Sequence, residues 1–243
     1  MSKLSVWHGR AGLALVLLTC GLGACSDDTF TLKISRPADE RPDYSDPPGA
    51  SAVHVPGEQP FNLVPFTSGQ NGHGSGQASA TPAGNASAKG QAENGGSAFG
   101  EFQLGYAFDY AGKKPGGAVV HVKLEASQAT ETDGGDADTS AAATLTLLVK
   151  DSNGLALHTE PLLVGKSPGG TKALSAAETS TLDLPLAPGV GYYIVVAGRV
   201  DAKSATGKHS ASAALDVKGC AITLEWRSGG EARAAAVSPA ASP

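Results

Sequence analysis

The chain is poor in residues that crosslink a fold or mark nucleic-acid-binding proteins. It has three cysteines, one methionine and an aromatic content of 5%. Its formal net charge is −5, and no cluster of lysine and arginine is present to neutralise phosphates. A nucleic-acid partner is therefore excluded, because such proteins need a basic face. Helical periodicity of apolar residues is also missing, so we expect an all-β fold.

Motifs for catalysis and metal binding are missing as well. The sequence has no Gly-x-Ser-x-Gly elbow and no Cys-x-x-Cys pair, and its histidines lack the spacing of a zinc site. Gly165-Lys166-Ser167 is similar to the end of a phosphate-binding loop, but Glu160 stands where the first glycine belongs, so we predict an ordinary loop. We expect a noncatalytic protein with no metal and no cofactor. Beyond the first 24 residues, the histidines are scattered at His54, His73, His121, His158 and His209.

One acidic loop leaves two interpretations open. Glu131, Asp133, Asp136 and Asp138 surround two glycines, and carboxylates on a flexible loop are typical calcium ligands. The spacing is not that of an EF-hand, which has a bidentate glutamate at its twelfth position. Residues 131–138 are therefore either a solvated loop between strands or a calcium site.

The first 25 residues have the pattern of an export signal. Lys3 and Arg10 precede a short apolar run, and the small residues Gly23 and Ala24 stand directly before Cys25. The apolar run is shorter than the ~20 residues that span a bilayer. Leu22-Gly23-Ala24-Cys25 resembles the lipobox of bacterial lipoproteins. That resemblance implies removal of residues 1–24, a diacylglycerol on the sulfur of Cys25 and an acyl group on its amine.

Lipidation would place the protein in the bacterial cell envelope. Two or more acyl chains anchor a protein stably, whereas one chain gives only marginal binding. Ser26 follows the cysteine, and by resemblance to enterobacterial sorting it favours the outer membrane over the inner membrane. Cys220 is then the single free thiol. It alternates with Ile222 and Leu224, so we predict that it is buried on the apolar face of a strand.

Residues 25–98 read as a disordered tether. Proline, glycine, serine, asparagine and alanine dominate this region, and residues 68–96 show no hydrophobic periodicity. About 70 flexible residues would have a root-mean-square span of roughly 45 Å. Two short apolar pieces, residues 29–35 and 52–66, are exceptions. Each is either an added strand or packed segment of the folded domain, or a partner-binding peptide.

Residues 99–227 predict an antiparallel β-sandwich of about eight strands. Large apolar residues alternate with small or polar ones from Phe102 to Tyr110, which is the period of a strand with one buried face. Turns rich in glycine, proline and asparagine separate the strands. The last region, 228–243, reads as a disordered tail. The strands are expected at residues 102–110, 118–126, 143–150, 155–164, 181–186, 190–200, 211–217 and 220–226.

A family resemblance covers this domain. Thr144 to Gly154, an apolar strand that ends in Asp-Ser-Asn-Gly, precedes Leu182 to Gly198, a Pro-Gly turn with a Tyr-rich strand. Together these segments resemble bacterial pre-peptidase C-terminal domains. The resemblance implies a secreted β-sandwich that accompanies enzymes or surface proteins and has no catalytic residues.

Exposed aromatic residues are the candidates for ligand contact. Tyr192 and Tyr193 are neighbours on one strand, so at least one of them points away from the core. Trp226, near a strand end, is a further candidate for stacking on sugar rings. We expect a noncatalytic, lipid-anchored binding or surface-structural module whose partner is an envelope protein or polysaccharide. The alternative is an accessory or regulatory subunit of an envelope complex or secreted enzyme.

Overall fold

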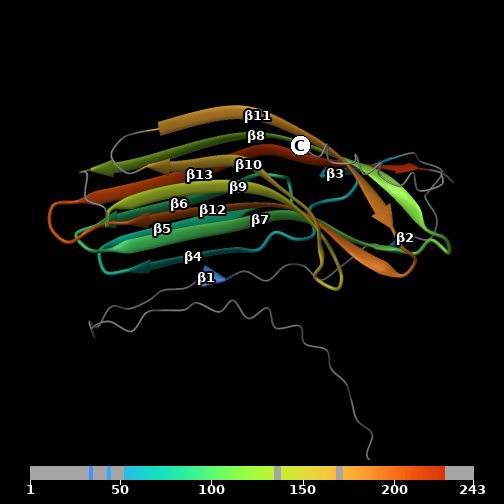
Figure 1. Ribbon diagram of the computed structural model, residues 1–243, viewed down its shortest axis with the longest axis horizontal. Helices are drawn as coiled ribbons and strands as arrows, with labels where there is room; N and C mark the ends of the chain where they lie inside the picture. Colours follow the sequence, from blue (N-terminus) through green and yellow to red (C-terminus); the bar gives the residue numbers. More distant parts are fainter. Residues whose placement is uncertain (1–32, 35–42, 45–51, 134–137, 168–171, 228–243) are drawn as a thin grey trace, which may run out of the picture.

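Two facing β-sheets make up the fold in the computed structural model (Figure 1). The structure describes residues 33–34, 43–44, 52–133, 138–167 and 172–227. These residues form thirteen strands and no helix, which confirms the predicted all-β antiparallel sandwich. The strands are β1 (Lys33–Ile34), β2 (Asp43–Tyr44), β3 (Ala52–Val55), β4 (Phe66–Asn71), β5 (Gly74–Ala80), β6 (Ala86–Glu93), β7 (Ser97–Tyr110), β8 (Gly116–Asp133), β9 (Ser140–Asp151), β10 (Ala156–Ser167), β11 (Lys172–Leu186), β12 (Val190–Lys203) and β13 (Ser210–Arg227).

The order of strands differs between the two sheets. Sheet A runs β1-β4-β7-β12-β9-β10, with β2 beside β7, and sheet B runs β11-β8-β13-β6-β5, with β3 beside β13. All pairings are antiparallel except that of the two-residue β2 with β7. At one side of the sandwich β4 packs on β5, and at the other side β10 and β11 are the edge strands (Figure 1).

Large apolar side chains at alternate positions of β7 form one half of the core. Phe102, Leu104, Tyr106 and Phe108 are almost fully buried between the sheets. Each such side chain contributes about 1.5–3 kcal/mol relative to an exposed position. The Phe108 ring stacks on Tyr192 and meets Trp226 edge-on, with ring centroids 5.6 and 5.7 Å away. This end of the sandwich therefore has an aromatic core.

The other half of the core is made of small side chains. Ala88, Ala92, Ala143, Ala202 and Ala213 are buried there, on strands of both sheets. Alanine fills little space, so the sheets approach closely. A Cβ atom placed on Gly76 of β5 would lie 2.5 Å from the backbone oxygens of both Gly69 and Phe99, closer than real contacts allow. Glycine is therefore required where β5 crosses β4 and β7.

The predicted tether is wrong for residues 52–98. Strands β3, β4, β5 and β6 lie within this range, and β7 begins at Ser97. On β6 the small residues point inward and Ser87, Lys89 and Gln91 point outward. The two-residue period of a strand is therefore present, but the inward positions are alanine and glycine. A search for large apolar residues misses such a strand. Apart from 33–34 and 43–44, residues 25–51 lie outside the described residues, as do the signal at 1–24 and the tail at 228–243.

The strands from residue 97 onward are longer and fewer than predicted. Seven strands cover this part of the described chain, in place of about eight. The two strands expected at 211–217 and 220–226 are one strand, β13, with a bulge against β8 between Lys218 and Ala221. Gly219 has a φ of +58°, which glycine adopts at low cost, so the expected turn is a bulge. The sandwich therefore covers residues 52–227 of the described chain, with the two-residue strands β1 and β2 added to sheet A.

Candidate binding surface

A shallow depression of about 320 Å³ lies on the outer face of sheet A. Its side chains come from two neighbouring rows across β7, β12 and β9, because Phe99 pairs with Asp201, and Lys203 pairs with both Ser97 and Ser140. Gly69 of β4, beside Phe99, leaves the space open. We call this hollow the Phe99 depression. Its outward-facing side chains are Ser97, Phe99, Ser140, Asp201 and Lys203.

The floor of the Phe99 depression is backbone. Gln70, Ala98 and Ala202 also line it, but they alternate with the outward residues, so their side chains belong to the other face of the sheet. Beneath this floor lies β5, at the close approach of Gly76 described above. A strand packed directly against the floor leaves it little freedom to move.

A charged network fixes the rim of the depression. The Arg199 guanidinium donates from Nε to Asp201 Oδ2 at 2.7 Å and from Nη2 to Asp201 Oδ1 at 2.6 Å, and Nη1 contacts Glu101. Its Cζ atom lies 5.6 Å from the centroid of the Phe99 ring. The hydrogen bonds to Asp201 raise the pKa of Arg199 above its usual value, so the side chain stays cationic. Asp201 and Phe99 are thus oriented before any ligand arrives.

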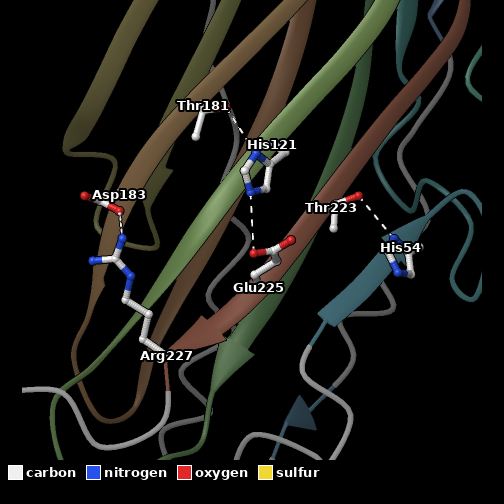
Figure 2. A network of polar contacts seen from close by, with 7 residues as sticks. All are labelled: His54, His121, Thr181, Asp183, Thr223, Glu225 and Arg227. Carbon is white, nitrogen blue, oxygen red and sulfur yellow. Dashed lines mark hydrogen bonds and ion pairs between the residues drawn. The ribbon is translucent and has the colours of Figure 1, made fainter.

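The outer face of sheet B carries a second polar network (Figure 2). His121 of β8 contacts Thr181 of β11 through Nδ1 at 3.1 Å and Glu225 of β13 through Nε2 at 3.6 Å. His54 of β3 contacts Thr223 of β13 at 3.2 Å. Thr181, His121, Thr223 and His54 lie in register across four strands, and Glu225 lies two residues further along β13. Their side chains contact one another on an exposed surface.

An exposed ion pair lies on the same face, at the end of β13. Arg227 Nη2 donates to Asp183 Oδ1 of β11 at 2.6 Å (Figure 2). Both side chains are more than half exposed, and exposed pairs typically contribute about 0.2–1 kcal/mol. The face of Figure 2 is a solvated sheet surface that carries cross-strand polar pairs.

A third cluster joins the edges of the two sheets. Glu160 Oε2 of β10 accepts a hydrogen bond from Ser180 Oγ of β11 at 2.5 Å and lies 3.3 Å from Nε2 of His158. These bonds lower the pKa of Glu160, with the bond from Ser180 the largest cause. The carboxylate stands between the hydroxyl and the imidazole. A Ser-His-Asp triad instead places the imidazole between the other two groups.

The structure places the predicted site residues in different surroundings. Cys25, the lipidation candidate, lies outside the described residues. Cys220 is fully buried, as predicted, and desolvation raises the pKa of its thiol to about 12. Glu131 and Asp133 belong to the end of β8, whereas Asp136 falls outside the described residues. Among the described residues no group of three or more possible metal ligands is found.

The structure also corrects one smaller sequence prediction, the loop at residues 165–167. The Gly165-Lys166-Ser167 segment is the end of β10 and not a loop. Its strand pairing continues to Ser167 opposite Ala141, so the predicted loop is wrong for these residues.

The aromatic residues differ in how far they are exposed. Tyr192 is buried, and its hydroxyl accepts a hydrogen bond from the Ala187 amide at 2.7 Å. Tyr193 is partly exposed on the outer face of sheet A, which confirms that one of the pair points away from the core. Trp226 packs against the core. Sequence reasoning missed Phe99, because its neighbours Asp201 and Gly69 come from distant segments that only strand pairing brings together.

Residues 52–66 are part of the domain. Val53 and Val55 of β3 and the side chain of Phe61 are buried in the core. Asn62 bonds both backbone groups of Ala107, and Leu63 forms a bridge with Gly105. Of the two interpretations for this segment, the packed strand is therefore correct and the partner-binding peptide is wrong. Of residues 29–35, only Lys33 and Ile34 are described, and they pair with β4.

Comparisons with known proteins give no family. No family model matches the chain, and no curated protein matches it. A solved structure, the enzymatically active domain of tailspike protein 4 from bacteriophage CBA120, is similar at 12% identity and a TM-score of 0.24. The match covers 72% of this chain and 19% of that one, so the chain spans about a fifth of the tailspike structure. In the described residues, no helix is long and apolar enough to cross a membrane.

Proposed function

We propose that this chain is a noncatalytic binding module of the bacterial cell envelope, anchored through lipid on Cys25. The observation that carries the binding role is the Phe99 depression, where an aromatic ring, a carboxylate and an amine share one hollow with its charged rim already paired. Groups that are fixed before binding lose little conformational entropy when a ligand arrives. The resemblance to pre-peptidase C-terminal domains supports the same role.

The lipid anchor is supported by the lipobox-like sequence at Leu22 to Cys25. Ser26 favours the outer membrane. Eight residue steps separate Cys25 from Lys33, the first of the described residues to pair with the sandwich. A fully extended chain advances about 3.3–3.6 Å per residue, so this connection reaches at most roughly 29 Å. The domain would therefore stay close to the lipid surface and would not move on a long leash.

The noncatalytic part of the proposal is supported by the way the polar groups are engaged. In the cluster at the β10 edge, Ser180 donates to Glu160 and not to His158, so the imidazole is not placed to take the proton of the hydroxyl. On the outer face of sheet B the histidines are bonded to threonines. These arrangements are typical of side chains that hold a surface together.

Mass spectrometry of the N-terminal peptide tests the anchor. The wild-type protein from its native host should begin at Cys25, carry the mass of a lipid modification and sediment with membranes. Cys25→Ala should lose the lipid mass and the sedimentation, whereas Cys220→Ala, the matched control, should keep both. Wild-type protein without lipid mass would overturn the anchor.

A second function, as an accessory subunit of an envelope complex, is favoured by one observation. Leu157 and Val164 on the edge strand β10, and Leu155 directly before it, are exposed to 38%, 52% and 62%. Exposed apolar side chains along an unpaired edge strand are typical of protein contacts. Under this proposal Leu157→Asp with Val164→Asp would abolish co-purification of one envelope protein, and the sheet B variant His121→Ala would not.

A further inference from the structure

We infer that the Phe99 depression binds a neutral saccharide. This inference rests on the proposed binding function and names its ligand class. The hollow brings together an aromatic side chain, hydrogen-bond donors and hydrogen-bond acceptors. They lie on two neighbouring rows of paired residues on one face of sheet A.

The charges of the hollow and its rim favour a neutral ligand. Arg199 and Lys203 supply two positive charges, and Glu101 and Asp201 supply two negative ones, so the sum is zero. Arg199 already pairs with both carboxylates. An anionic ligand would be attracted by Lys203 and repelled by Asp201. A cationic ligand would be attracted by Asp201 and repelled by Lys203. Neither gains a net Coulomb attraction.

The groups in the hollow match the two surfaces of a sugar ring. A pyranose has an apolar C–H face, which the partly exposed Phe99 ring can contact. Its adjacent hydroxyls both donate and accept hydrogen bonds. Asp201 only accepts and Lys203 only donates, while Ser97 and Ser140 do either. A pair of neighbouring hydroxyls can therefore bond to the carboxylate and the ammonium at once.

The position of these groups is set in advance. Two hydrogen bonds from Arg199 orient the Asp201 carboxylate, and the same guanidinium lies over the Phe99 ring. The backbone floor is backed by β5 at Gly76. Only the exposed Lys203 has to become ordered on binding, which is a small entropic cost.

The size and shape of the hollow point to a polymer. Its volume of about 320 Å³ is at the low end for small-molecule sites, and it opens onto a flat sheet face. A short stretch of a longer chain fits this shape, with the rest of the polymer lying along sheet A. We therefore expect envelope polysaccharide, and not a free monosaccharide, to bind tightly enough to measure.

Calorimetric titration of the full mature chain in detergent micelles tests the inference. The probes are the neutral and the acidic polysaccharide fractions from the host's own envelope. The neutral fraction should bind more tightly. Phe99→Ala should weaken that binding about tenfold or more, which corresponds to about 1.4 kcal/mol. Ser140→Trp should do the same, because the new side chain fills the hollow from an exposed position while Phe99, Asp201 and Lys203 all remain.

Two control measurements make the outcomes distinct. His121→Ala, on the outer face of sheet B, should leave the affinity unchanged, and circular dichroism should show that each variant is folded. Equal binding by wild type, Phe99→Ala and Ser140→Trp would overturn this site and leave the proposed binding function intact. Preference for the acidic fraction would overturn the neutral ligand. Absence of binding to either fraction would overturn the saccharide.

Discussion

The Ser180 hydroxyl donates a hydrogen bond of 2.5 Å to the Glu160 carboxylate and so connects the edge strand of sheet B to the edge strand of sheet A. Glu160 pairs with the fully buried Leu147, but at the open edge of the sandwich its side chain is 40% exposed. Its charge is satisfied by Ser180 and by His158 at the open side of the sandwich. The two sheets are thus held together at this edge by polar contacts, where β10 and β11 do not pair.

Removing this carboxylate should destabilise the fold at neutral pH. The pKa of Glu160 in the folded protein lies below its usual 4.5, so its stabilisation is full above that value and is lost as the pH falls through the folded value. Glu160→Gln should cost about 1 kcal/mol, since the side chain is partly exposed. Urea unfolding of both proteins from pH 7 to pH 3 measures the difference.

That difference should shrink once the pH falls below 4.5. Glu225→Gln, which removes an exposed carboxylate 3.6 Å from His121, is the control and should change stability little at any pH. A constant difference between wild type and Glu160→Gln across the whole range would contradict the role of the charge.

The glycine in β5 should be irreplaceable. In Gly76→Ala the new Cβ would meet two backbone oxygens at 2.5 Å, and neither can move without separating β5 from β4 and β7. We expect a loss of roughly 1–3 kcal/mol or more in the free energy of unfolding. Gly117→Ala, where the nearest atom lies 3.7 Å away, is the matched control and should be tolerated. If both variants unfold at the same urea concentration, residues 74–80 are not packed in this way.

The Asn62 side chain should stabilise the fold by making the two hydrogen bonds that a neighbouring strand would make to Ala107. Its side-chain amide donates to the Ala107 carbonyl and accepts from the Ala107 amide, both at 2.8 Å. Asn62→Ala leaves both backbone groups unpaired and should cost about 1–3 kcal/mol. Asn62→Asp cannot donate, so it should also destabilise the fold, whereas Asn153→Ala on an exposed turn should not. Thermal unfolding of the three variants compares them, and an unaltered Asn62→Ala would exclude this role.

The thiol of Cys220 should be inert in the folded protein. Burial raises its pKa to about 12, so almost no thiolate exists at pH 8. Ellman's reagent should therefore react slowly with the native chain and quickly in 6 M urea, where the side chain is exposed. Fast reaction without denaturant would show that the core at β13 opens readily.

The strands with large residues could be predicted from the sequence. Phe102 to Phe108 alternate with small or polar residues, and the structure places them in the core as expected. Cys220 was placed correctly by the same argument. The period-2 signal is strong when one face carries Phe, Leu and Tyr, because these side chains have no stable position outside a core.

The strands with small residues could not be predicted in this way. Ala86, Ala88 and Ala92 are buried on β6, but alanine is common in loops and tethers and carries little hydrophobic signal. Gly76 lies in a polar, glycine-rich stretch that predicts a flexible segment. Only the backbone packed against it shows why glycine is needed there. The Phe99 depression was missed for the same reason, because register alone brings Phe99 to Asp201 and Lys203 to Ser140.

A crosslinking pull-down from native membranes tests the lipid-anchored binding module most directly. The wild-type chain and the Cys25→Ala and Phe99→Ala variants would be compared, with recovered material identified by mass spectrometry and sugar analysis. We predict that the wild type sediments with membranes and recovers neutral envelope polysaccharide. Cys25→Ala should be released from the membrane, and Phe99→Ala should stay anchored without its ligand. Equal solubility of the wild type and Cys25→Ala, or a wild type that recovers no envelope component, would contradict the account.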